Sequence, residues 1–286
     1  MKVSRNLKYA LGLIALLAPV LLTSGCAYLN KVIAKDSLNQ GVIQYNQGKI
    51  KGAQEFFKSA TDRDPSSPMA WLYYGATMVA DYRSLAEPER TRIATEAVEI
   101  YKKALELSGG NCKIADNAIS YVATIYDDLS NMEEWRKWIL KRAEGDCSDK
   151  NTKAATYYSV SVKYWDCAYT QTQRFQDKSN KDPNAYRNMD YSEEAKKDKA
   201  KAEDCTAKGL EYVERALQVD PEYVDAFYYK SLLYLEKQKL TKEEPKRKEY
   251  DAIAKKLHVQ AGALQKKREA AAAAAAAQQP QAPPQG

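Results

Sequence analysis

Three segments of the chain share one pattern of small and large apolar residues. They read GAQEFFKSATDRDP over residues 52–65, EAVEIYKKALELSG over 96–109 and KGLEYVERALQVDP over 208–221. Each has a small residue second, a large apolar or aromatic residue four positions later, and an alanine three positions after that. These spacings form one stripe along an α-helix, and small residues let a neighbouring helix approach. The pattern therefore predicts helices that pack against other helices.

A second pattern begins at two Asp-Pro pairs. DPSSPMAWLYYGA from Asp64 and DPEYVDAFYYKSL from Asp220 align without a gap, with Ala, an aromatic residue and a pair ending in Tyr at matching positions. Proline disfavours helix in the residue before it, so each Asp-Pro pair marks the end of one helix. The chain is therefore predicted to be all-α and built from helix-turn-helix units.

These units resemble the tetratricopeptide repeat, which is a helix-turn-helix unit of about 34 residues. The first unit meets the pattern of that family at Gly41, Tyr45, Gly48, Ala53, Phe57, Ala60 and Pro65. The resemblance implies a right-handed superhelical solenoid of about five units over residues 36–268. A generic helical bundle with coincidental spacing is the alternative.

The later units depart from the repeat. The second has about ten extra residues, DYRSLAEPER and its neighbours, between its helices. The third has Trp135 where a small residue is expected, so its second helix must pack differently. The fourth begins near Lys153 and resumes around Asp204, after a polar insertion at about 174–200. The fifth is expected to end with a helix within residues 246–265.

The N-terminus has the composition of a secretion signal. Lys2, Arg5 and Lys8 precede about 14 largely apolar residues, 9–22, with no acidic residue among them. A helix that spans a bilayer needs about 20 apolar residues, so this run is short for a permanent anchor and suits a cleaved signal.

Cys26 follows directly after the small residues that end this signal. This arrangement resembles the bacterial lipoprotein signal, in which cleavage occurs before the cysteine and its thiol is acylated, for example with palmitate. Thr23 departs from that pattern, which usually has Leu there. An ordinary cleaved signal with a chance cysteine is the alternative. Ala27 favours the outer membrane over the inner membrane by resemblance to the enterobacterial sorting rule.

The expected organisation follows from these features. Residues 1–25 would be the signal peptide, 26–35 a lipidated tether, and 36–268 the solenoid. Residues 269–286 would form an Ala-rich and Pro/Gln-rich tail, whose last residues are too rich in Pro and Gln to fold.

Four further cysteines, Cys112, Cys147, Cys167 and Cys205, make an even number that suits two disulfides in an oxidising compartment. From the register of the repeat we expect the pairs 112–147 and 167–205. The CxxC pairs of zinc sites are missing from the sequence, and His258 is the one histidine, so no metal or other cofactor is expected.

Charge and motifs argue against several functions. Removal of the signal takes away three basic residues and lowers the formal charge from +6 to +3. This charge does not indicate a nucleic-acid partner. The sequence contains no glycine-rich phosphate loop and no nucleophile elbow, so we expect a protein that is not an enzyme.

The resemblance also implies a concave groove lined by the first helix of each unit, where related proteins hold peptides or partner segments. Tyrosine recurs at one position of this groove, in units two, three and five. The candidate partner-binding residues are Asn39, Tyr45, Tyr73, Tyr121, Asp127, Asp128, Tyr228 and Tyr229. Tyrosine gives a large contact area with a polar tip, which suits interfaces.

The resulting hypothesis is a lipid-anchored periplasmic adaptor or scaffold that binds a protein partner in an envelope assembly, of the outer-membrane, pilus or secretion type. A lipoprotein that binds cell wall or glycan is one alternative. An accessory subunit of an envelope enzyme complex is another.

Overall fold

The computed structural model describes residues 28–179 and 193–277, and within these ranges the chain forms α-helices and one short 3-10 helix, with no strand. The prediction of an all-α protein is confirmed. The expected signal, Cys26 and the end of the tail lie outside the described residues. The chain divides into two compact units, Met1–Trp138 and Ile139–Gly286, which are described separately.

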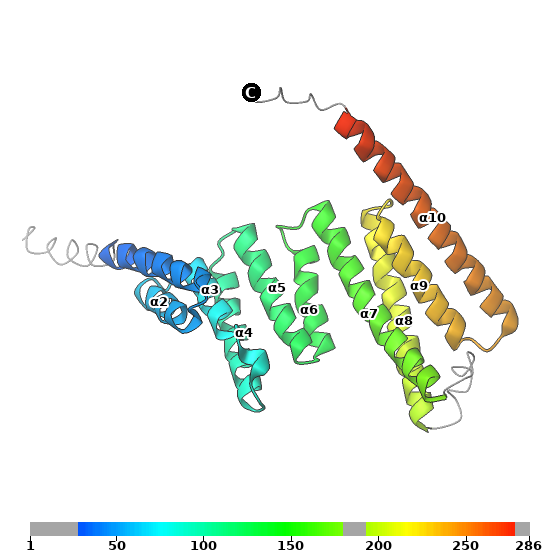
Figure 1. Cartoon of the computed structure of the whole chain (residues 1–286), viewed down its shortest axis with the longest axis horizontal. Coiled ribbons are helices and arrows are strands. Elements are labelled where there is room, and N and C mark those ends of the chain that lie inside the picture. Colours follow the sequence, from blue (N-terminus) through cyan, green and yellow to red (C-terminus); the bar gives the residue numbers. More distant parts are fainter. Residues whose placement is uncertain (1–27, 180–192, 278–286) are drawn as a thin grey trace, which may run out of the picture. The chain divides into compact units, whose positions relative to one another are not determined.

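The first unit is a series of antiparallel helices, and the consecutive helices between residues 50 and 128 pack on one another (Figure 1). Residues 28–46 form its first helix. The following elements are α2 (Ile50–Arg63), α3 (Pro68–Met78), η1 (Tyr82–Ser84), α4 (Glu89–Glu106), α5 (Cys112–Asp128) and the start of α6 (Met132–Glu144).

Local sequence explains where these helices end and begin. Gly48 has a φ of +73°, a conformation that glycine adopts without strain, in the turn before α2. The side chain of Ser67 accepts a hydrogen bond from the backbone N–H of Ala70 at the start of α3. Asn111 does the same for Ile114 at the start of α5. Such caps satisfy N–H groups that have no partner inside the helix.

The repeated small and aromatic residues form the core of this unit. Phe57 and Tyr101 are fully buried, and each ring lies against the backbone of a glycine in the preceding helix. A Cβ atom added to Gly41 would lie 2.5 Å from the ring of Phe57, and one added to Gly75 would lie 2.8 Å from that of Tyr101. Only glycine allows this approach, which is why the sequence repeats it.

The second unit begins within α6 and continues with α7 (Lys150–Ser179), α8 (Glu193–Val219), α9 (Val224–Leu240) and α10 (Glu244–Ala277). α8 packs on α7, α9 on α8 and α10 on α9, and α9 also contacts α7. One core cluster of this unit consists of Val213, Ala216, Ala226 and Leu233. Gly209 again faces a large side chain, since its added Cβ would lie 2.6 Å from Leu233.

Two helices of the second unit extend into the insertion expected at about 174–200. α7 continues to Ser179 and α8 already begins at Glu193, so Cys167 lies well inside α7 rather than at its end. The residues that begin α8 are rich in Glu, Ala and Lys, which favour helix. For the same reason α10 continues through the alanine run to Ala277, beyond the expected 246–265.

One carboxylate of the second unit is buried. Glu236 of α9 is 2% exposed, and the hydroxyl of Thr172 on α7 donates a hydrogen bond of 2.7 Å to it. Lys239 forms an ion pair of 2.6 Å with the same carboxylate. A buried carboxylate is costly without such partners, so this group ties α7 to α9.

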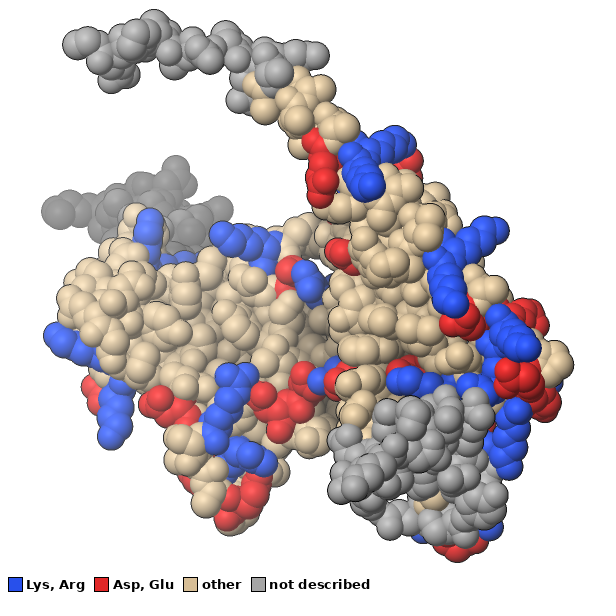
Figure 2. Space-filling view, turned by 45° about the vertical axis from the view of Figure 1, so that its right-hand side comes forward, with Lys and Arg blue, Asp and Glu red and all other residues tan. Residues whose placement is uncertain are grey.

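The visible surface differs between the two units. Figure 2 shows lysine, arginine, aspartate and glutamate interspersed over the second unit, whereas uncharged residues predominate on the first unit at the left of the view. None of the helices in the described ranges is sufficiently long and apolar to cross a membrane.

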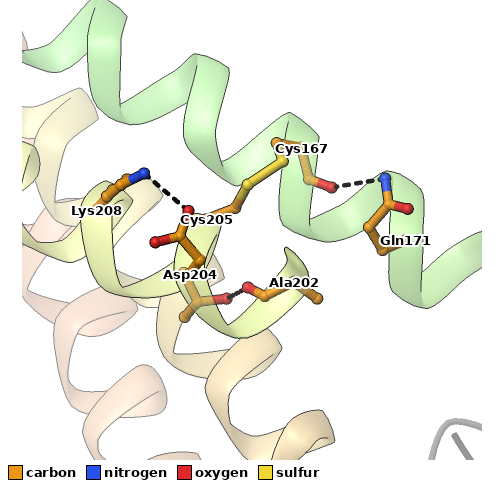
Figure 3. Close-up of a disulfide and its surroundings, with 7 residues drawn as sticks. Cys167, Gln171, Ala202, Asp204, Cys205 and Lys208 are labelled. Carbon is orange, nitrogen blue, oxygen red and sulfur yellow. Dashed lines mark hydrogen bonds and ion pairs between the residues drawn. A yellow bond between two sulfur atoms is a disulfide. The ribbon is translucent and has the colours of Figure 1, made fainter. Parts of the chain in front are cut away.

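A disulfide joins Cys167 of α7 to Cys205 of α8, with their Cα atoms 6.0 Å apart (Figure 3). This is the pairing that the repeat register predicts. An ion pair of 2.8 Å between Lys208 and Asp204 lies beside it on α8. Cys112 and Cys147 fall in different units, and the bond expected between them stays a prediction.

Candidate functional site

Two tyrosines of the expected groove stack on the core rings of the preceding helix pair. The ring of Tyr73 lies 5.2 Å from that of Phe57, with 15° between their planes. The ring of Tyr121 lies 4.9 Å from that of Tyr101, with 20° between their planes. The order glycine, core ring, tyrosine is therefore the same in two successive repeats.

The exposed side of this stack lines a cavity of about 280 Å³ in the first unit. Tyr45 and Tyr121 form part of its wall, and they keep 39% and 40% of their surfaces exposed. The remaining lining residues come from α3, the connection that follows it, and α5: Ala76, Val79, Ala80, Tyr82, Arg83, Thr124 and Ile125. The cavity is slightly smaller than pockets for drug-sized ligands, which measure about 300–1,000 Å³. Its size therefore suits one or two side chains of a bound segment.

The extra residues between α3 and α4 build one wall of this cavity. Tyr82 is only 2% exposed, and its hydroxyl donates a hydrogen bond to the carboxylate of Asp128 at the end of α5. Nε of Arg83 donates a hydrogen bond of 2.7 Å to the same carboxylate oxygen. Asp128 therefore holds the insertion against α5.

Tyr121 and Tyr82 stay neutral at physiological pH because their surroundings raise the pKa of each hydroxyl group. Burial raises the pKa of Tyr121, and the neighbouring Tyr45 and Tyr73 raise it further. Burial also raises the pKa of Tyr82, and its hydrogen bond to Asp128 acts in the same direction. The cavity thus presents uncharged rings and hydroxyl groups, with the guanidinium of Arg83 as the one charge among the residues that line it.

The other candidates of the first unit lie outside the lining of this cavity. Asn39 is exposed on the helix over 28–46, and Asp127 is half-buried on α5. Tyr73 is half-buried against Phe57. Of the expected groove residues in this unit, Tyr45 and Tyr121 are therefore the two that meet at the cavity.

The candidates of the second unit have a different environment. Tyr229 meets Tyr158 and Trp165 edge-on, with ring centroids 5.4 Å and 5.3 Å away. The position that holds Phe57 and Tyr101 in the earlier repeats is Val213 here, so Tyr229 has no core ring at that position to stack on.

Tyr228 is half-buried on α9 and lies edge-on to His258 of α10, with 5.3 Å between the ring centroids. His258 is exposed, as the sequence suggests for a lone histidine on a charged helix. Among the described residues, no group of three His, Cys, Asp or Glu side chains is arranged to hold a metal ion.

Sequence reasoning missed Tyr82 and Arg83. The signal was present, because an aromatic residue and an arginine stand in a connection that is longer than the repeat allows. Their positions could not be derived, since their partner Asp128 lies 46 residues from Tyr82.

No protein-family model matches the chain, and no curated protein matches it. Several solved structures resemble it at low identity. A crystal structure of MamA protein is 15% identical, with a TM-score of 0.47 over 88% of this chain and 98% of that one. YrrB, described as a TPR protein with an unusual peptide-binding site, is 15% identical, with a TM-score of 0.40 over 80% and 90%.

MamA 41-end from Desulfovibrio magneticus RS-1 is 14% identical, with a TM-score of 0.43 over 82% of this chain and 96% of that one. The tetratricopeptide-like character of the helix pairs rests on contacts within this chain. The close approach of Phe57 to Gly41 and of Tyr101 to Gly75 occurs at the positions that the repeat pattern assigns.

Proposed function

We propose that this protein is a lipid-anchored adaptor of the cell envelope that holds a segment of a partner protein in the tyrosine-lined cavity of its first unit. It would act by raising the local concentration of that partner at the membrane. The observation that carries the proposal is the pair of exposed rings, Tyr45 and Tyr121, at a cavity with an apolar floor.

The character of the cavity supports binding of a protein segment. Tyrosine is enriched at interfaces because it contributes a large, rigid contact area and a hydroxyl group. Tyr121 is held in place by its stack on Tyr101, so little side-chain entropy is lost when a partner binds. The guanidinium group of Arg83 lines the cavity as well and adds hydrogen-bond donors to this surface.

The anchor and compartment rest on the sequence. A short apolar signal followed by Cys26 fits a lipoprotein, and two or more acyl chains anchor stably where one is marginal. The Cys167–Cys205 disulfide is compatible with an oxidising compartment such as the periplasm. We propose the outer membrane as the location, because Ala27 follows the cysteine and resembles the sorting signal for that membrane. The protein would act there in an assembly of the outer-membrane, pilus or secretion type.

Crosslinking in cells tests the groove. A photoreactive residue is placed at Tyr45, Tyr121 or Thr124, and at Phe56 on α2 as a control of similar exposure, 37%, that does not line the cavity. One protein crosslinked from all three cavity positions, but not from Phe56, is the expected result. Its binding by purified protein should then weaken with Tyr121→Ala.

Other outcomes would separate the alternatives. Equal adducts from Phe56 and the cavity would contradict a groove site. Titration with soluble cell-wall glycan tests the glycan alternative, which predicts saturable binding that depends on Tyr121. Mass spectrometry of the mature N-terminus tests acylation of Cys26 independently of any partner.

A further inference from the structure

Exposed apolar side chains are concentrated on the first described helix, over residues 28–46. Tyr28, Leu29, Val32 and Ile43 have 73%, 58%, 49% and 46% of their surfaces exposed. At about 100° per residue, Tyr28, Val32 and Ile43 fall within roughly 60° of one another around the helix, and Leu29 lies beside them. We name these four residues the N-terminal apolar face.

The opposite side of this helix provides its packing. Ala34 and Ser37 are buried, and Gly41 lies against the ring of Phe57. The helix therefore has one side inside the fold and a second, largely apolar side that stays exposed and also carries Asp36 and Asn39. Terminal units of repeat proteins usually have a polar outer face, because an apolar one favours association. We therefore expect a partner surface to cover this second side of the helix.

The position of the lipid identifies that surface. If Cys26 is acylated, as the proposed function requires, Tyr28 follows it with only Ala27 between them, and this span is at most about 7 Å. The headgroup layer of one leaflet is roughly 5–8 Å thick. Tyr28 and Leu29 must then lie in or against this layer, where tyrosine is favoured at the boundary between water and hydrocarbon.

Charge around the face has the sign that a membrane surface attracts. On the helix over residues 28–46 the chain has Lys31 and Lys35 against Asp36, which gives 2 − 1 = +1, and Lys49 and Lys51 follow in the next turn and α2. All four lysines are exposed. Each basic residue near an anionic surface contributes about 1 kcal/mol of attraction.

We propose that the N-terminal apolar face lies on the bilayer surface, with the helix over 28–46 parallel to the membrane plane. A helix that stood upright would lift Ile43 about 22 Å above Tyr28, at 1.5 Å per residue. A helix that lies flat brings both residues to the headgroups. The lipid then holds the protein at the membrane, and this face fixes the orientation in which the first unit presents its cavity.

The test uses the full-length mature protein, with Cys26 acylation verified by mass spectrometry, in vesicles of phosphatidylethanolamine and phosphatidylglycerol. A photoreactive residue replaces Leu29, Val32 or Ile43. Val259 on α10 is the matched control, since it is an apolar side chain with 71% exposure in the other unit. We expect phospholipid adducts from all three positions and water adducts from Val259.

A second variant checks that the apolar face itself makes the contact. The double variant Leu29→Glu/Val32→Glu should reduce phospholipid adducts at position 43 by at least about tenfold. Burial of one Leu or Val side chain in the membrane contributes more free energy than a tenfold change in the bound population requires. The acyl chains should keep this variant on the vesicles. Unchanged adducts at position 43 would overturn the inference.

The remaining outcomes separate this inference from the proposed function. Water adducts at all three positions of an acylated protein would overturn the membrane contact and leave the anchor intact. Adducts at 29 without adducts at 43 would overturn the flat orientation. Adducts to a second copy of the chain would make the face an interface between copies. An unacylated Cys26 would overturn both the anchor and this inference, while leaving the groove to its own test.

Discussion

Tyr121 and Tyr101 stack with their ring centroids 4.9 Å apart, yet only one of them reaches the surface. Tyr101 is fully buried, and its hydroxyl has no hydrogen-bond partner among the described residues. Tyr121 is 40% exposed and lines the cavity. The stack therefore joins a residue of the core to a residue of the proposed binding surface, and substitutions should separate their roles.

Tyr101→Phe should raise the free energy of unfolding by about 1 kcal/mol, because it removes a buried hydroxyl that makes no hydrogen bond. Tyr101→Ala should lower that free energy by about 3–5 kcal/mol, since it leaves a cavity in the core. Denaturant unfolding of both variants measures the difference. A loss of stability in Tyr101→Phe above about 1 kcal/mol would mean that the hydroxyl has a partner, such as a bound water.

Tyr121→Ala should weaken binding of the crosslinked partner by about 30-fold, the effect of losing an aromatic anchor worth roughly 2 kcal/mol. Calorimetric titration of purified protein with the partner segment measures this change. Tyr169→Ala is the matched control, because Tyr169 is 37% exposed and also stacks on a ring, that of Trp165. Equal losses in both variants would show that the effect is not specific to the cavity.

The glycines that face core rings should not tolerate a methyl group. Gly41→Ala and Gly75→Ala should each lower the free energy of unfolding by about 1–3 kcal/mol, because the new Cβ would overlap Phe57 or Tyr101. Gly262→Ala in α10 should instead raise it by about 1 kcal/mol, because that position has no atom within 4 Å and alanine favours helix. Unchanged or higher stability in Gly41→Ala and Gly75→Ala would contradict the close approach of ring and glycine.

Stability should fall at alkaline pH as buried tyrosines ionise. Burial, with the nearby Tyr229, raises the pKa of Tyr158 to about 12, while an unfolded tyrosine has a pKa of about 10. The neutral form is thus favoured by folding, so this contribution is complete below pH 10 and is lost as pH rises from about 10 to about 12. Unfolding measured across this range should show a shallower decline for Tyr158→Phe. An identical decline would place the responsible groups elsewhere.

Local spacing made the helix pairs predictable. The interval of sixteen residues from Gly41 to Phe57 lies inside one repeat, so the contact between them follows from the repeat pattern alone. The same holds for the turn at Gly48, where a positive φ requires glycine. Such features depend only on residues that are close in sequence. A single repeat motif includes all of these residues, so the sequence pattern is enough to predict them.

The wall of the cavity was not predictable in the same way. Tyr82 and Arg83 stand in an irregular connection, and their position depends on Asp128 in a later repeat. Sequence reasoning placed Asp128 in the groove, but its pairing with both residues could not be read from spacing. The environment of Tyr229 also differs from that of Tyr73 and Tyr121, because Val213 stands in the preceding helix where the other repeats have an aromatic ring.

The bond between Cys167 and Cys205 has a consequence for how the protein withstands proteases. It closes a loop of 38 residues, so a single cut anywhere between these cysteines leaves two pieces that remain covalently joined. A cut in the connection between α7 and α8 would leave these two helices side by side, and they could keep their packing. A nicked molecule would then migrate as one chain on a non-reducing gel and as two after reduction. It could keep its function after a cut that would separate the two pieces of a protein without this disulfide.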